Sequence, residues 1–146
     1  MEQPFSDQEK QVVDAMIALT RLSNLHRTII AGNDSLKLYV ALRRRGFLRV
    51  ATPATCNVRR REHSVGLIAG QSSLASIEAT LIEISLFLSN RAAIAILISS
   101  NQADFSLKIR RKLEQMGFRT EAGVNCHQGL VLSAYRQGFV QMEQAA

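Results

Sequence analysis

The first residues whose types suggest chemistry form the turn Gly32-Asn33-Asp34. The turn joins a short apolar run, residues 28–31, to a segment with helical spacing, so it lies between the end of a strand and the start of a helix. Open α/β sheets bind ligands at such junctions. The Asp34 carboxylate would repel a phosphate but would pair with an amino group. Two interpretations stay open: Asp34 contacts a ligand, or it only caps the helix while Gly32 permits the turn.

Two arginine triplets form a second group of candidate residues, one at the end of the predicted helix and one ahead of the next strand. They are Arg43, Arg44, Arg45, Arg59, Arg60 and Arg61. In a parallel sheet both triplets fall at the edge where strands begin, opposite the ligand edge. We expect the six arginines to bind an acidic partner, either a nucleic-acid backbone or an acidic protein face. The alternative is a stabilising role at the negative end of the helix dipole.

The other polar residues predict neither a metal site nor a catalytic centre. The histidines, His26, His63 and His127, are scattered, and none is paired at helical spacing with another ligand type. Cys126 adjoins His127, but a thiol and its base need a third residue that the local sequence does not supply. We therefore expect no metal and no catalytic residues.

The composition indicates one globular domain. The chain has 146 residues, of which 47% are hydrophobic and 21% charged, and its formal net charge is +6. Cys56 and Cys126 lack metal-binding spacing and suggest free thiols in a reducing compartment. The polar amino terminus is unlike a secretory signal, and the longest apolar run, residues 92–98, is too short to cross a bilayer. We expect a cytoplasmic protein without a membrane partner.

In the first half of the chain, periodicity predicts an amphipathic helix over residues 7–23, introduced by the capping box Ser6-Asp7-Gln8-Glu9. This helix either packs on the sheet or offers its apolar stripe to a second copy of the chain, in a homodimer. A second helix, over residues 34–45, ends at Gly46 and is followed by an extended segment. Residues 53–63 have no clear period and should form a loop.

The second half has the clearer pattern. A strand over residues 64–69 is closed by Gly70, and Ser72 or Ser73 caps a helix whose apolar residues advance by three and four positions. Asn90 and Arg91 should then turn the chain into a continuously apolar strand, typical of a central parallel strand.

A striped helix ending at Gly117 and two closing strands, over residues 118–124 and 130–135, complete the pattern. The order predicts an α/β fold: a three-layer α/β/α, Rossmann-like, mostly parallel sheet with a C-terminal antiparallel hairpin and an N-terminal helix. We expect the N-terminal helix within residues 1–25, the α/β domain in 26–137 and a polar tail in 138–146.

The segments KLEQMGFRTEAGV and GLVLSAYR, within this order of elements, resemble the carboxyl-terminal half of class I S-adenosylmethionine-dependent methyltransferases. The resemblance covers roughly residues 26–136. It implies a final strand inserted antiparallel to the others. It also implies S-adenosylmethionine as the cofactor, if there is one, held around Gly32, Asn33, Asp34 and Gly70.

Several features of that family are missing. The turn E/D-x-G-x-G-x-G retains one glycine, Gly32, and Val50-Ala51-Thr52-Pro53 stands where an acidic residue would hold the ribose. Gly70-Gln71-Ser72 replaces the D/N-P-P-Y/F signature, and the 53–63 loop replaces a strand and a helix. The chain therefore resembles a shortened, degenerate member, and no cofactor is expected.

Three functions are consistent with the sequence. The first is a methyltransferase-like domain that has lost catalysis and acts as a binding or regulatory module. The second is a small active S-adenosylmethionine-dependent methyltransferase. The third is a basic winged-helix nucleic-acid-binding protein, which would require residues 27–32 to form a turn.

Overall fold

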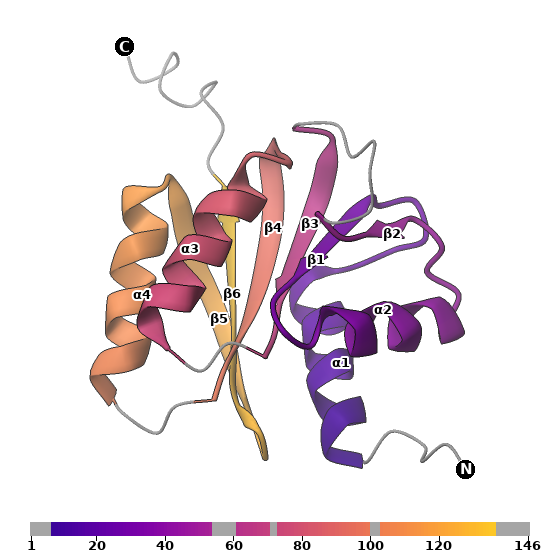
Figure 1. Cartoon of the computed structure of the whole chain (residues 1–146), viewed down its shortest axis with the longest axis horizontal. Helices are drawn as coiled ribbons and strands as arrows, with labels where there is room; N and C mark the ends of the chain where they lie inside the picture. Colours follow the sequence, from indigo (N-terminus) through magenta and orange to yellow (C-terminus); the bar gives the residue numbers. More distant parts are fainter. Residues whose placement is uncertain (1–6, 54–60, 71–72, 100–102, 137–146) are drawn as a thin grey trace.

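The computed structural model describes residues 7–53, 61–70, 73–99 and 103–136, which form a six-stranded sheet covered by helices on both faces (Figure 1). In chain order the elements are α1 (Asp7–Thr20), β1 (Thr28–Ala31), α2 (Ser35–Arg44), β2 (Val50–Ala51), β3 (His63–Ile68), α3 (Leu74–Ser85), β4 (Leu88–Ile98), α4 (Ala103–Gln115), β5 (Phe118–Cys126) and β6 (Gly129–Arg136).

The strand order across the sheet is β2-β1-β3-β4-β6-β5. Strands β2, β1, β3 and β4 are parallel, and β6 lies antiparallel between β4 and β5. The chain leaves β1 toward β2 and then crosses to β3 on the other side of β1. This reversal creates a topological switch point between the carboxyl ends of β1 and β3. The predicted fold, with its antiparallel closing hairpin, is confirmed.

Two cores lie on opposite faces of the sheet. Alternate side chains of β4 point to opposite faces, so Ala95 and Leu97 join the core under α1 and α2, whereas Ile94 and Ile96 join the core under α3 and α4. In α1, the fully buried Met16 belongs to the first core. The apolar stripe of α1 is therefore used within the chain, which is the first of the two alternatives for that helix.

The start of β4 differs from the prediction. Asn90 and Arg91 were expected in a turn, but they lie inside β4, which begins at Leu88. The guanidinium group of Arg136 donates hydrogen bonds to the carbonyls of Leu88 and Ser89, at 2.8 and 3.3 Å, and so holds this segment extended. Local sequence cannot show a contact between residues that lie nearly 50 positions apart.

The other boundaries deviate little. Helix α1 ends at Thr20, three residues before the predicted end, and Ser73 rather than Ser72 caps α3, accepting a hydrogen bond from the Ser76 amide at 3.1 Å. Ser6 of the predicted capping box, the 54–60 segment and the predicted tail lie outside the described residues.

The winged-helix interpretation is wrong. It required a turn at residues 27–32, whereas β1 occupies residues 28–31, is buried at every position and pairs with strands on both sides. An internal strand of a six-stranded sheet has no equivalent in that interpretation.

If α1 is part of the cooperative core, then Met16→Ala should lower the free energy of unfolding by about 2–5 kcal/mol, because it leaves a cavity under the helix. Urea denaturation monitored by circular dichroism measures this change. The exposed Lys10→Ala in the same helix is the matched control and should stay within about 0.5 kcal/mol of the wild type. Equal stability of both variants would show that α1 is not part of the folded core.

Candidate functional site

Two glycines meet at the switch point. Gly32 follows β1 with φ of +104°, and Gly70 follows β3 with φ of +86°. A Cβ atom on Gly32 would lie 2.0 Å from the Ala69 carbonyl oxygen, and one on Gly70 would lie 2.4 Å from the Asp34 backbone nitrogen. Both positions therefore require glycine. The structure brings together Gly32, Asp34 and Gly70, three of the four residues predicted around this site, and the fourth, Asn33, is exposed beside them.

Backbone hydrogen bonds join the two turns directly. The Asp34 amide donates to the Ala69 carbonyl at 3.3 Å, and the Ala69 amide donates to the Ala31 carbonyl at 3.2 Å. The chain therefore continues the β1–β3 pairing past the ends of both strands. No ligand can enter between the two turns at this point, because their backbones are in contact.

The Asp34 side chain does not cap α2. Asp34 occupies the N-cap position, but its carboxylate makes no capping hydrogen bond, so the simple-cap interpretation is wrong. A Cβ on Gly70 would lie 2.8 Å from the Asp34 carboxyl carbon, which places the carboxylate against the opposite turn. The side chain is thus oriented toward the switch point and not toward the helix amides.

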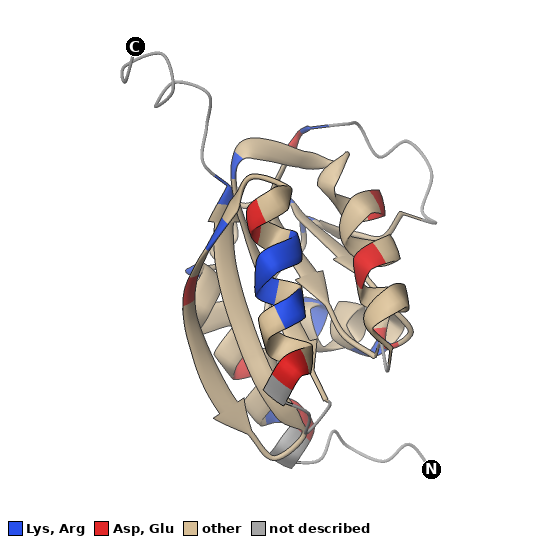
Figure 2. Cartoon of the chain, turned by 90° about the vertical axis from the view of Figure 1, so that its left-hand side faces the viewer, with Lys and Arg blue, Asp and Glu red and all other residues tan. Residues whose placement is uncertain are grey.

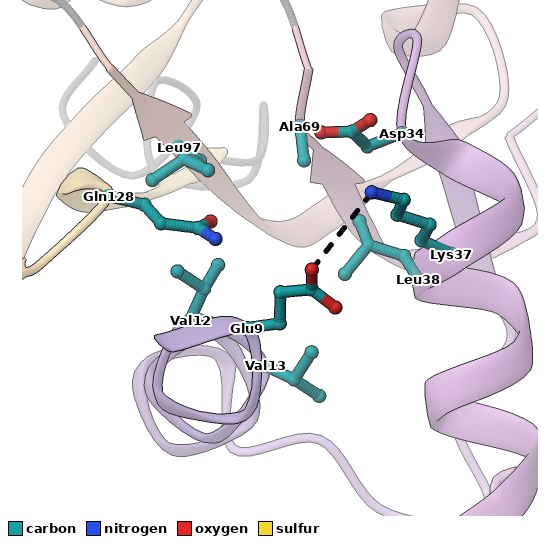
Figure 3. A pocket seen from close by; sticks show the side chains of 9 residues that line it. All are labelled: Glu9, Val12, Val13, Asp34, Lys37, Leu38, Ala69, Leu97 and Gln128. Carbon is teal, nitrogen blue, oxygen red and sulfur yellow. Dashed lines mark ion pairs between the residues drawn. The ribbon is translucent and has the colours of Figure 1, made fainter. Parts of the chain in front are cut away.

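A pocket opens beside this contact, between the first turns of α1 and α2 (Figure 3). It is small, with about 40 Å³ of space that water can reach, and its lining residues come from α1, α2, two strand ends and the β5–β6 turn. They are Glu9, Val12, Val13, Asp34, Lys37, Leu38, Ala69, Leu97 and Gln128. The floor is apolar and charged groups stand at the mouth, where Lys37 and Glu9 form an ion pair at 4.0 Å.

Three polar residues of this pocket were not predicted from the sequence: Glu9, Lys37 and Gln128. For Lys37 a signal existed, because it lies three residues after Asp34 and so shares its side of the helix. The other two residues come from elements far away in the sequence. The charged mouth suits a small polar ligand that bears an amino group.

The α2 arginines are engaged within the chain. Arg45 forms an ion pair with Asp14 of α1, and Arg43 lies 5.7 Å from the Tyr39 ring centroid while donating to the Leu48 carbonyl at 3.3 Å. Arg44 is exposed, though not without a partner. These contacts support a local stabilising role.

In the second triplet, Arg61 is exposed. Arg59 and Arg60 lie outside the described residues. Arg61 lies close enough to Arg136 to lower the pKa of that guanidinium, after the larger effect of burial. The six-arginine patch for an acidic partner stays a prediction.

A second pocket, which sequence reasoning missed, lies at the opposite edge of the sheet, where β1, β2 and β3 begin. Its lining consists of Arg27, Arg49, Val50, Ala51 and His63. The His63 side chain is buried, and its Nδ1 has no hydrogen-bond partner among the described residues. Burial lowers the pKa of His63, the Phe87 carbonyl opposes this shift, and Arg27 lowers the pKa further.

In the described part of the chain, no three His, Cys, Asp or Glu side chains are placed to hold a metal ion. None of the described helices has the length and apolar character needed to span a membrane.

No family model and no curated protein matches the chain. Solved structures, however, do match its fold. A release-factor-specific protein-(glutamine-N5) methyltransferase from Alicyclobacillus acidocaldarius shares 17% identity at a TM-score of 0.62, over 94% of this chain and 99% of that chain. A ribosomal protein L11 methylase from Lactobacillus delbrueckii shares 12% identity at a TM-score of 0.61, over 92% and 81%.

A [4+2]-cyclase also shares the fold, with 11% identity at a TM-score of 0.59, over 94% of this chain and 85% of that chain. Identities this low establish architecture alone. The chain has the Rossmann-like fold of class I S-adenosylmethionine-dependent methyltransferases.

The contact between the Gly32 turn and the Gly70 turn predicts that three glycine-to-alanine variants lose different amounts of stability. Gly46→Ala adds a Cβ at a similar φ, +93°, in open space, so it should cost only the backbone strain of about 1–2 kcal/mol. Gly32→Ala and Gly70→Ala should cost about 1–3 kcal/mol more, because the added atom also displaces the facing turn. Chemical denaturation compares the three variants. Equal losses in all of them would contradict the close packing of the turns.

The buried His63 predicts a dependence of stability on pH. Its pKa in the folded chain lies below its ordinary value of 6.5, so between the two values the unfolded chain binds more protons. The free energy of unfolding should therefore decrease as the pH falls below 6.5, and His63→Phe should lessen this decrease. Melting curves between neutral and mildly acidic pH test this. His127→Gln, at an exposed position, should retain the wild-type behaviour.

Proposed function

We propose that this chain is a methyltransferase-like domain that has lost methyl transfer and acts as a binding or regulatory module. The observation that carries the proposal is the direct contact between the turns after β1 and β3. Gly32 lies against the Ala69 carbonyl and Gly70 against Asp34, so the backbone fills the space between these two turns at the switch point. Ligands of open α/β sheets bind in the crevice at a switch point.

The residues present do not fit the whole of S-adenosylmethionine, the cofactor that the fold implies. Asp34 could pair with its amino group at the mouth of the pocket. The family's acidic residue at the end of β2, which would hold the ribose hydroxyls, is absent, because Thr52 and Pro53 follow that strand. Among the described residues, the amino group of the cofactor thus has a carboxylate partner and the ribose does not.

The fold is compatible with a function other than methyl transfer. One of the similar structures is a cyclase by its description, although it has the same architecture. A fold of this kind hosts several functions, and the side chains at the site decide between them.

In our proposal the chain works in the cytoplasm, and its candidate partners are a second copy of the chain or an acidic macromolecule.

The second candidate function is a small active S-adenosylmethionine-dependent methyltransferase. The observation in its favour is the pocket next to the switch point, which has an apolar floor and places the Asp34 carboxylate at its mouth. This carboxylate is not engaged in capping α2, so it is available to an amino group.

Calorimetric titration with S-adenosylmethionine and S-adenosylhomocysteine, together with thermal-shift measurements, separates the two functions. We expect neither a saturable heat nor a shift in melting temperature. A bound cofactor at about 100 times its Kd would instead stabilise the fold by about 2.7 kcal/mol, which is readily detected.

The matched variants are Asp34→Asn, in the pocket, and Asp104→Asn, at an exposed position of α4. Saturable binding that is lost in Asp34→Asn but kept in Asp104→Asn would overturn the non-catalytic proposal and favour the second candidate. Methyl transfer to any acceptor would overturn it outright.

A further inference from the structure

Arginines recur where the strands of this sheet begin. Arg27 directly precedes β1, Arg49 directly precedes β2, and Arg61 lies two residues before β3. Arg119 is the second residue of β5. It lies level with Ala93, near the start of β4, because both residues pair with Tyr135 of β6. All these residues therefore lie at one edge of the sheet, which we call the amino edge.

The two remaining strands add an arginine each at this level, Arg91 within β4 and Arg136 at the end of the antiparallel β6. Arg136 is half-buried and bonded to backbone carbonyls, whereas the other five arginines are exposed. Every strand thus contributes one arginine. Figure 2 shows basic residues at the upper rim of the molecule, where β6 ends, and a further basic group on α4.

Acidic residues reach the amino edge too, but in the described part of the chain they are fewer. Glu62 forms an ion pair with Arg27 at 2.7 Å, and Glu83 and Glu114 lie in the last turns of α3 and α4. The Arg27–Glu62 pair is weak because both side chains are well exposed. A stronger anion can therefore compete for Arg27.

The pocket formed by Arg27, Arg49 and His63 is a built feature of this edge. It is a shallow hollow, wide open to solvent, and it lies where β1, β2 and β3 begin. His63 is 6% exposed, and its Nδ1 lacks a hydrogen-bond partner among the described residues. The two arginines at this hollow suit a phosphate group, because guanidinium donors bind its oxygens in pairs.

The length of the arginine row favours a polymer over a small phosphorylated molecule. Six strands spaced about 4.8 Å apart place the outermost arginines about 24 Å from each other, which exceeds the reach of one phosphate. A nucleic-acid duplex presents charge along its whole length, so successive arginines find a phosphate in any register. Among the described residues, the lining of this pocket is more polar and charged than apolar, which favours a polyanionic partner.

We propose that the amino edge binds the phosphodiester backbone of a nucleic-acid duplex, with one phosphate seated between Arg27, Arg49 and His63. Binding is independent of base sequence, because guanidinium contacts to phosphate carry no sequence information. The inference names a partner for the binding role proposed above and so rests on it, but the surface lies at the edge opposite the α1–α2 pocket.

The test is fluorescence anisotropy with short labelled duplexes of RNA and of DNA, at about 0.1 M salt, where the Debye length is about 10 Å. The double variant Arg27→Gln/Arg49→Gln should weaken binding about tenfold or more and reduce the slope of log K against log salt by about two, because each arginine neutralises one phosphate. The matched control Arg110→Gln/Arg111→Gln removes the same charge from exposed positions of α4 and should weaken binding less than threefold, a change of about 0.6 kcal/mol.

Melting curves confirm that both double variants are folded. Binding of RNA or DNA that depends on Arg27 and Arg49 supports the inference. It is overturned by the absence of binding to either duplex, by equal losses in the two double variants, or by equal competition from poly-glutamate, which would indicate an acidic protein partner. The cofactor titration is a separate measurement, so failure of the nucleic-acid inference and failure of the non-catalytic proposal are distinguishable.

Discussion

The packing of two glycine turns against each other is the constraint on which this structure depends. Because Gly32 and Gly70 carry no side chains, the backbone after β1 touches the backbone after β3, and the Asp34 amide extends the strand pairing beyond both strands. The contact fixes where α2 begins and how the Asp34 carboxylate is oriented. It also leaves no space between the two turns at this point of the sheet.

Much of the fold follows from the sequence, because apolar runs and helical spacing are local signals. β1, α3 and the apolar part of β4 were predicted within a few residues. The start of β4 was not, because Asn90 and Arg91 have turn-like chemistry and are held extended by the distant Arg136. At the candidate site, the family resemblance placed Gly32 and Gly70 together, but the local sequence shows each only as a turn. Their contact depends on β1 and β3 being neighbours in the sheet, a long-range pairing that no local pattern encodes.

The amino-edge pocket escaped prediction for the same reason. Arg27, Arg49 and His63 belong to three segments and become neighbours only through the strand order. A weak signal was present, since an arginine stands just before several of the predicted strands. The two edges are separated by the length of the strands, about 20 Å for the six residues of β3. A substitution at one edge should therefore leave the geometry of the other edge unchanged.

The outer strands of the sheet have a consequence for self-association. β2 has only two residues, so it offers almost no backbone ladder to which another chain could add a strand. At the opposite border, β5 exposes the charged side chains of Arg119 and Glu121 beside its free backbone groups. Both borders therefore resist β-augmentation and the edge-to-edge aggregation that follows from it. A dimer of this chain would form more readily through exposed apolar side chains away from these borders, such as Leu36 of α2, which is 71% exposed.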